Sequence, residues 1–328
     1  MTRTDSITDV AGLEVGHFTD SRRPTGCTVV VAREGAVGGV DVRGAAPGTR
    51  ETDLLSPTNL VEKVHAILLA GGSAWGLDAA SGVMRWLEEQ GVGMTVGPAR
   101  LPLVPGAVLF DLLIGDSSIR PDAQAGYQAC VNASRDAPAQ GCVGAGTGAA
   151  IGKIFGIDRA MKGGIGSASA TVDGVTVAAL VACNALGDVI DPDTAQIIAG
   201  ARTPDGKSLF DTRRALLAGT PPRQLIAGTN TTIGVIATDA VITKVQATRL
   251  AQVGHDGLAR SINPVHTMSD GDTLFALGTG AAGKSPGMTV LGTMAAEVTA
   301  RAVVRAIRAA QSLTVGALHL PSASDFGP

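Results

Sequence analysis

The chain has 328 residues, of which 45% are hydrophobic and 17% are charged, and its formal net charge at pH 7 is −3. This composition supports a substantial buried core, and without a basic block neither nucleic acid nor an anionic membrane is expected as a partner. No apolar stretch approaches the roughly 18 residues of a membrane helix, and the first residues lack a signal-peptide pattern, so we expect a cytoplasmic protein.

The cysteines and histidines show no pattern of metal ligands. The chain has four cysteines, none in a C-x-x-C pair, and five histidines without metal-ligand spacing. Isolated cysteines of this kind usually serve as small buried side chains in proteins of a reducing compartment. We therefore expect neither a metal nor a cofactor.

Short runs rich in β-branched residues predict strands, and apolar residues at helical spacing predict helices. Ser73 is expected to cap the first helix. This mixed order, without strict alternation, favours an α+β fold over a doubly wound sheet. The predicted elements are a strand at 28–32, a strand at 64–69, a helix at 73–90, a strand at 175–181, a strand at 232–237, a helix at 244–261, a strand at 273–277 and a helix at 288–310.

One motif favours a different function. Residues Gly278 to Ser285 match the phosphate-loop pattern G-x-x-x-x-G-K-[ST], and a predicted strand precedes them. Pro286 and Gly287 follow at once, where a phosphate-binding helix should continue, and both residues weaken a helix start. A Gly-rich connection between a strand and the last helix is the alternative interpretation.

The stretch GTNTTIGVIA places Asn230, Thr231 and Thr232 directly before an apolar run. An internal threonine hydroxyl is a weak nucleophile, whereas a chain-terminal threonine carries its own base, an α-amine with a pKa of about 7.7–8.0. Thr231 gains that amine if its hydroxyl attacks the Asn230 carbonyl and the resulting ester is hydrolysed. The alternative is a turn at Asn230 that leads into an ordinary strand.

Four further residues are candidates for the same site. Asp270 and Asp272 sit at i and i+2 before the predicted strand 273–277 and are expected to share a face. Two carboxylates so close need cationic or hydroxyl partners. Lys153 is a lone cation in a Gly-rich stretch, and Asn184 follows an apolar run. Each also has a structural interpretation, as a turn former or a surface residue.

The chain resembles the P1-family peptidases, which comprise DmpA-type aminopeptidases and nylon-oligomer hydrolases and are N-terminal-nucleophile hydrolases. The resemblance spans nearly the whole sequence. It rests on the ordered segments DVAGLEVGHF, GTRETDLL, LLAGGSAWGL, VPGAVLFDL, GAGTGAAIGK, MKGGIGSAS, ACNALGDVIDP, TNTTIGVIATDA and INPVHTMSDGDTLFAL.

The resemblance implies a four-layer αββα sandwich of the type shared with ornithine acetyltransferases. It also implies one domain that cleaves itself at Asn230–Thr231 into a large fragment, 1–230, and a small fragment, 231–328. Relatives form tetramers or other oligomers, so a homo-oligomer, such as a homotetramer, is expected.

The resemblance also implies roles for single residues. Thr231 would be the nucleophile and base, Lys153 would stabilise charge, and Asn184 would help to bind the oxyanion. Asp270 and Asp272 would orient Lys153 and the Thr231 amine. Phe110 replaces a tyrosine of some relatives and would only shape the substrate pocket, while Lys162 and His266 are further candidates for the site.

The predicted function is hydrolysis of a small peptide or amide, such as a β-, D- or ω-amino oligomer, through an acyl-enzyme on Thr231. One alternative is an acyltransferase of the ornithine-acetyltransferase type, in which an amine replaces water. Others are an unprocessed, non-catalytic binding protein and a phosphate-loop nucleotide binder.

Overall fold

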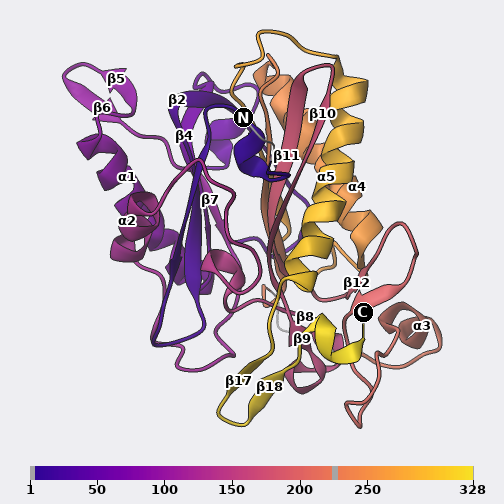
Figure 1. The fold of residues 1–328 in the computed structure, drawn as a ribbon. Helices are drawn as coiled ribbons and strands as arrows, with labels where there is room; N and C mark the ends of the chain where they lie inside the picture. The colour runs from indigo at the N-terminus through magenta and orange to yellow at the C-terminus, as the bar shows by residue number, and fades with distance from the viewer. Residues whose placement is uncertain (1–3, 224–227, 328) are drawn as a thin grey trace.

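The structure is a computed structural model that describes residues 4–223 and 228–327. Its main element is a nine-stranded mixed sheet in which the strands follow the order β10-β11-β14-β16-β2-β4-β7-β3, with β1 added beside β2 (Figure 1). These strands are β1 (Glu14–Thr19), β2 (Gly26–Val42), β3 (Thr49–Arg50), β4 (Lys63–Ala70), β7 (Gly106–Val108), β10 (Gly164–Val172), β11 (Val175–Asn184), β14 (Thr231–Thr238) and β16 (Thr273–Gly278).

Two helices cover each side of this sheet (Figure 1). The pair α1 (Ala79–Glu89) and α2 (Ala123–Val131) packs at one side, and the pair α4 (Lys244–Ser261) and α5 (Met288–Arg308) packs at the other. A short helix, α3 (Thr212–Leu217), lies apart from these layers, near the small strands described next. The described helices are not long and apolar enough to cross a membrane.

Smaller sheets complete the molecule. They are the pair β5 (Met94–Val96) and β6 (Ala99–Leu101), the pair β8 (Ala150–Ile151) and β9 (Met161–Lys162), the triplet β12 (Asp188–Ile190), β13 (Ile197–Ala199) and β15 (Ile262–Asn263), and the pair β17 (Leu313–Val315) and β18 (Leu318–Leu320).

The burial of alternate residues shows that the two halves of the large sheet face each other. On β11, Val177, Ala179 and Val181 contact the α4–α5 layer, while Ala178 and Leu180 point into a central apolar cluster.

The strand β4 shows the same alternation on the other half of the sheet. Its residues Ala66 and Leu68 face the α1–α2 layer, while Ile67 and Leu69 enter the same central cluster. Side chains alternate between the faces of a strand, so both halves bury both faces. The result is the predicted four-layer αββα arrangement.

Small residues allow one helix layer to approach its sheet closely. A Cβ on Gly166 of β10 would lie 2.2 Å from the carbonyl oxygen of Ala302 and 2.3 Å from the amide nitrogen of Ala306, both on α5. The backbone of α5 therefore rests almost directly on the β10 backbone, which explains Gly164 and Gly166 in this strand.

Most predicted elements are present, with shifted ends. The helix predicted at 244–261 is α4, and the one predicted at 288–310 ends at Arg308. The strand predicted at 28–32 extends to Val42 because β2 continues past an irregularity between Val31 and Ala36. β10 and α2 were not predicted, since their Gly-, Ala- and Ser-rich sequences lack a strong apolar period.

The capping role predicted for Ser73 is wrong. Ser73 is the first residue of a 3-10 helix, Ser73–Asp78, whose preceding residue, Gly72, has φ +84°, and no side chain caps that helix. Helix α1 begins only at Ala79. Ser73 itself has φ +56°, so its backbone is left-handed, not the extended conformation of a capping serine.

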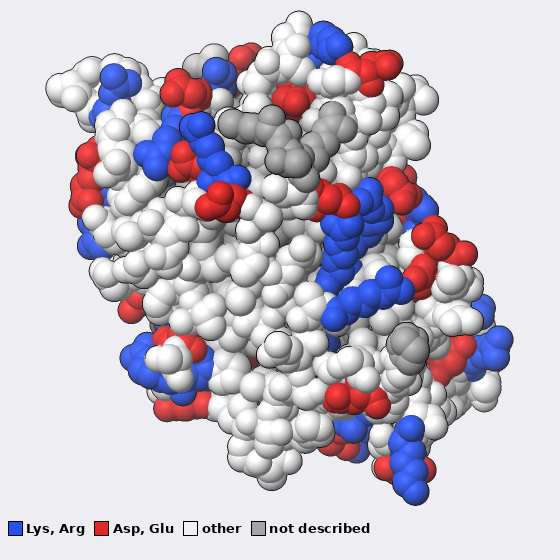
Figure 2. Space-filling model, in the orientation of Figure 1, with Lys and Arg blue, Asp and Glu red and all other residues white. Residues whose placement is uncertain are grey.

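Basic and acidic side chains are interspersed on the face shown in Figure 2, between large uncharged areas. Ion pairs elsewhere in the described chain include Arg301 and Arg305 of α5, which both contact Asp5, and Arg308, which contacts Asp191. Paired charges of this kind do not create the single-sign field that attracts a polyanion.

Candidate active site

Thr231 begins β14, in the middle of the large sheet, and only 2% of its surface is exposed. It lies opposite Asn184 of the antiparallel strand β11. On its other side β14 runs parallel to β16, and an isolated bridge joins Asn230 to Asp270. The sheet register therefore brings Thr231, Asn184 and the loop before β16 together, although they are distant in sequence.

Two donors meet at the carbonyl oxygen of Asn230. The Thr231 hydroxyl donates to it at 2.5 Å, and the amide N–H of Gly271 donates to it at 2.9 Å. A side chain on Gly271 would crowd this arrangement, because its Cβ would lie 3.0 Å from Thr231 Oγ1 and 2.7 Å from the Ala46 carbonyl oxygen. The contacts place a hydroxyl and a backbone donor at the peptide bond predicted to be cleaved.

Lys153 is buried beside this bond. It begins the 3-10 helix Lys153–Phe155, and its Nζ donates three hydrogen bonds of 2.9 Å, to the backbone oxygen and Oδ1 of Asn184 and to the Thr229 carbonyl. Burial lowers the pKa of Lys153 to about 7, although nearby Asp270 acts in the opposite direction. The lysine can therefore change protonation state near neutral pH.

The side chain of Asn184 is held at both ends. Its Oδ1 accepts hydrogen bonds from Lys153 Nζ and from the Ala150 amide, each at 2.9 Å, which defines the orientation of the amide group. Its Nδ2 donates to the backbone oxygen of Phe110 at 3.1 Å. Asn184 is thus rigid, and binding an oxyanion would require Nδ2 to share or release this bond.

The two carboxylates lie before β16, in the loop, so the expected shared strand face does not position them. Asp270 Oδ2 accepts from the Thr267 amide at 2.7 Å, and Asp272 Oδ1 accepts from the Thr232 amide at 2.6 Å. Burial, together with the like charge of Asp272, raises the pKa of Asp270. Asp272 is therefore bonded next to Thr231, and Asp270 is protonated more readily than a free aspartate.

His266 belongs to the site through Asp272. Both its backbone amide, at 3.1 Å, and its Nδ1, at 2.8 Å, contact Asp272 Oδ2. Its φ of +56° is unusual for a residue with a side chain. The sequence signal was its closeness to Asp270 and Asp272, but only the folded loop turns it toward Asp272.

A cavity of about 310 Å³ opens at Thr231. Phe110 lines it, whereas Lys153 and both aspartates do not. The described lining residues are Ala46, Pro47, Gly48, Ser73, Ala74, Val108, Phe110, Gly228 and Thr231.

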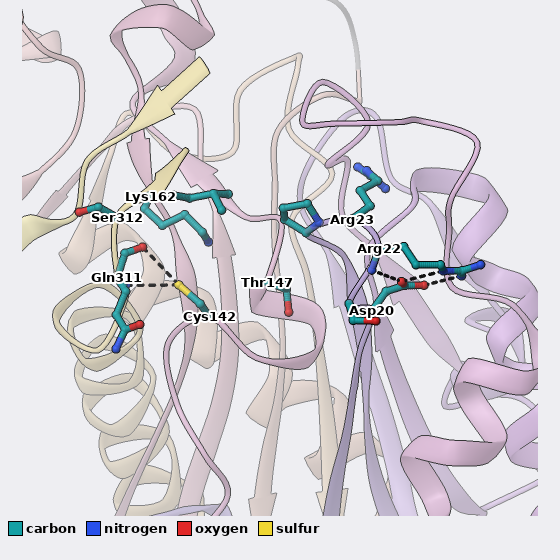
Figure 3. Close-up of a pocket in the computed structure, with 11 residues that line it drawn as sticks. Asp20, Arg22, Arg23, Cys142, Thr147, Lys162, Gln311 and Ser312 are labelled. Atoms are coloured by element: carbon teal, nitrogen blue, oxygen red, sulfur yellow. Dashed lines mark hydrogen bonds and ion pairs between the residues drawn. The ribbon is translucent and has the colours of Figure 1, made fainter. Parts of the chain in front are cut away.

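Lys162 lies in a different pocket (Figure 3). There Lys162 and Cys142 are on one side, Asp20 and Arg22 are on the other, and Thr147 is between them. Lys162 Nζ donates to the carbonyl oxygens of Gly146, Ala149 and Gly163 at 2.9–3.0 Å. These bonds use all three of its N–H groups. Lys162 therefore stabilises the backbone and does not line the cavity at Thr231.

The phosphate-loop match lacks the geometry of a phosphate site. The phosphate-loop match ends before α5, which starts at Met288 with Gly287 as its preceding residue, so Lys284 and Ser285 are outside the helix. Within residues 4–223 and 228–327, no group of three or more His, Cys, Asp or Glu side chains is arranged to hold a metal ion.

Known proteins resemble this chain in sequence and in fold. Peptidase family S58 matches residues 5–319. The chain is 45% identical to a Mycobacterium tuberculosis protein described as an uncharacterized aminopeptidase, over 99% of this chain and 98% of that one. It is 33% identical to the 6-aminohexanoate-oligomer endohydrolase of Paenarthrobacter ureafaciens, over 91% and 84% of the two chains.

A solved structure shows the same fold. The L-aminopeptidase D-Ala-esterase/amidase of Ochrobactrum anthropi, described as a variant of the Ntn-hydrolase fold, superposes with a TM-score of 0.72 over 97% of this chain and 90% of that one, at 20% identity. The family match, the sequence identity and the fold all indicate the same protein family. The chain belongs to peptidase family S58 and is a hydrolase of that family.

Proposed function

We propose that this protein is a self-cleaving amide hydrolase whose nucleophile is Thr231. The observation that carries the proposal is the pair of donors at the Asn230 carbonyl oxygen, the Thr231 hydroxyl at 2.5 Å and the Gly271 amide at 2.9 Å. The hydroxyl lies against the carbonyl group that it would attack, through its contact with the carbonyl oxygen, and the Gly271 N–H donates to the oxygen on which negative charge would develop.

Self-cleavage would proceed in two steps. Thr231 Oγ1 bonds to the Asn230 carbonyl carbon, the C–N bond breaks, and the nitrogen takes up the hydroxyl proton, which leaves an ester and a free amine on Thr231. Water then hydrolyses the ester, giving a carboxyl group on Asn230 and restoring the Thr231 hydroxyl. The fragments would be 1–230 and 231–328.

The new amine would then serve as the base for substrate hydrolysis. Thr231 Oγ1 attacks the substrate carbonyl, the amine accepts its proton and passes it to the leaving amine, and water releases the acyl group. Buried Lys153 lies near enough to the Thr229–Thr231 segment to stabilise negative charge, and Asp272, bonded to the Thr232 amide, lies near enough to orient the new amine.

The substrates would be small peptides or amides. The relatives include a protein described as an uncharacterized aminopeptidase and a 6-aminohexanoate-oligomer endohydrolase, and both names denote hydrolysis of amide bonds. A cavity of about 310 Å³ with an uncharged described lining suits a short acyl chain and not a folded protein. Assembly into a homo-oligomer, such as a homotetramer, is part of the same proposal.

The test is the intact mass of the purified protein under denaturing conditions. Cleavage at Asn230–Thr231 predicts two pieces of roughly 23 and 10 kDa, by residue share of the 32.9 kDa chain. Thr231→Ala should leave a single 32.9 kDa species, while the matched variant Thr232→Ser should still cleave. A wild-type protein that stays whole would contradict the proposal and favour a non-catalytic binding protein.

A second assay separates hydrolysis from acyl transfer. The cleaved protein is incubated with an amide substrate, with and without an added primary amine, and the products are identified by mass. Free acid in both cases supports hydrolysis. A product that forms only with the amine would identify an acyltransferase instead.

A further inference from the structure

The cavity at Thr231 offers very few side chains that can form hydrogen bonds. None of the described residues that line it is charged, and only Ser73 and Thr231 carry a side-chain hydroxyl. The other lining side chains are apolar or absent. If Thr231 is the nucleophile, Ser73 is the remaining described lining side chain that can recognise a polar group of a substrate.

Ser73 has an unusual backbone for a residue with a Cβ. Its φ is +56°, and it follows Gly72, whose φ is +84°. Glycine adopts this region readily, so a third glycine would be the less strained choice at this position. Strained residues of this kind cluster at binding and catalytic sites, where the surrounding structure holds them in place.

Two hydrogen bonds and a buried ion pair maintain the turn before Ser73. The Ser73 amide donates to the Leu109 carbonyl at 3.0 Å, and the Gly72 amide donates to Asp111 Oδ1 at 3.0 Å. Asp111 is in turn bonded by buried Arg23, at 2.8 Å, and by the Thr25 hydroxyl, at 2.6 Å. The position of Ser73 at the cavity wall is therefore rigid.

The described residues leave the hydroxyl of Ser73 free to bind a ligand. In the described part of the chain its Oγ has no hydrogen-bond partner, in contrast to its backbone amide. An N–H group that enters an apolar cavity loses its bonds to water unless a new acceptor replaces them. A hydroxyl at a rigid position is a suitable acceptor.

We propose that Ser73 is a specificity-determining residue, which accepts a hydrogen bond from an amine or amide N–H in the acyl part of the substrate. The inference rests on the proposed hydrolase function and adds the residue that recognises the N–H group of a short, otherwise apolar acyl chain. Purely aliphatic acyl groups would fit the same walls but would lack this bond.

The experiment compares two 4-nitroanilides that differ only in the terminal group of the acyl chain. The 3-aminopropanoyl and butanoyl anilides have acyl chains of equal length, with an amino group in one and a methyl group in the other. The value of kcat/KM is measured for both with wild type, Ser73→Ala, Ser73→Gly and the exposed control Ser118→Ala. The mass of the fragments shows whether each variant folds and cleaves itself.

We expect Ser73→Ala to cleave itself normally and to lower the ratio of the two kcat/KM values, amino over butanoyl, about 10- to 100-fold, as for one hydrogen bond from a charged ammonium group. Ser73→Gly should lower the ratio equally, because both variants lack the hydroxyl although only glycine relieves the strained φ. Ser118→Ala should match wild type.

Other results would overturn the inference. An unchanged ratio in Ser73→Ala, or an equal loss on both anilides, would mean that the hydroxyl does not recognise the amino group. Wild type that is cleaved into fragments but hydrolyses neither anilide would contradict the proposed hydrolase function, and the inference with it. Activity on both anilides with no effect of Ser73→Ala would contradict only the role of Ser73.

Discussion

At the scale of single residues, the candidate site is a set of buried polar groups whose charges depend on one another. Lys153 is bonded to carbonyl and amide oxygens and not to a carboxylate, and its pKa is lowered to about 7 by burial. The charge of Asp270 partly opposes that shift, while the pKa of Asp270 itself is raised by burial and by Asp272. The protonation of this cluster should therefore change near neutral pH.

Asp270→Asn tests this coupling. Removing the carboxylate takes away a charge that favours the ammonium form, so the pKa of Lys153 should fall below about 7. If the ammonium stabilises negative charge during hydrolysis, activity is present below that pKa and is lost as the pH rises through it. The descending limb of kcat/KM against pH should thus move to lower pH.

The pH profile of the residual activity is the measurement, with the exposed variant Asp136→Asn as the control. An unchanged position of the limb in Asp270→Asn would show that Lys153 is not the group that titrates. A limb that moved to higher pH would contradict the assigned direction of the coupling.

Gly271 gives a second prediction at this scale. A Cβ at this position would lie 3.0 Å from Thr231 Oγ1 and 2.7 Å from the Ala46 carbonyl oxygen, so Gly271→Ala should displace the amide that bonds the Asn230 carbonyl. Loss of one such donor typically costs ~10²–10³ in rate. Self-cleavage should slow by about that factor, which a time course of intact mass would measure.

Ser269→Ala in the same loop is the matched control. The Gly228 amide bonds the backbone oxygen of Ser269, and alanine retains that oxygen, so this variant should cleave at the wild-type rate. Normal cleavage by Gly271→Ala would show that the Gly271 amide is not needed for the reaction.

At the scale of elements, the contact between α5 and β10 depends on the absence of side chains. Because a Cβ on Gly166 would lie 2.2 Å from the Ala302 carbonyl oxygen, Gly166→Ala must push α5 away from the sheet. Such overpacking costs about 1–3 kcal/mol or more in the free energy of unfolding. Urea denaturation followed by circular dichroism would measure the loss.

Gly292→Ala in α5 serves as the comparison. The three atoms nearest to its Cβ would all belong to the side chain of Val253, at 3.3 Å or more, and alanine favours a helix more than glycine. Its stability should equal or exceed that of wild type. If Gly166→Ala had the same free energy of unfolding as wild type, α5 could move away from β10 without a loss of stability.

At the scale of the whole molecule, the proposed small fragment is built into the centre of the sheet. Its strands β14 and β16 lie between β11 and β2 of the large fragment, and its helices α4 and α5 cover one face. Both outer edges of this strand pair are hydrogen-bonded to the other fragment. Cleavage at Asn230–Thr231 should therefore not separate the two pieces.

Size-exclusion chromatography of the cleaved protein should give one peak that contains both fragments. Only denaturation should release them, because separation would break two strand pairings and expose apolar surface on both sides. The uncleaved Thr231→Ala variant should elute at the same volume. Separate elution of the fragments without denaturant would contradict the placement of β14 between β11 and β16.

Much of the fold could be predicted from local pattern. Strong apolar periods in 244–261 and 288–310 indicated helices that the structure contains, because an amphipathic stripe of that length has few other ways to be buried. The Gly-rich strand β10 and the short helix α2 could not be predicted in this way. Their stability comes from close packing against α5 and α1, which no local pattern records.

The candidate site shows the same division between what the sequence predicts and what tertiary packing decides. The sequence by itself determined the family resemblance and the candidates Thr231, Lys153, Asn184, Asp270 and Asp272, because these residue types carry the chemistry. Only the tertiary structure decided how these residues meet. In it the Gly271 amide donates to the Asn230 carbonyl and His266 contacts Asp272. Lys162 lies in another pocket, and Ser73 lines the cavity at Thr231. The physical reason is that strand register and the buried ion pair of Arg23 with Asp111 join segments far apart in the chain.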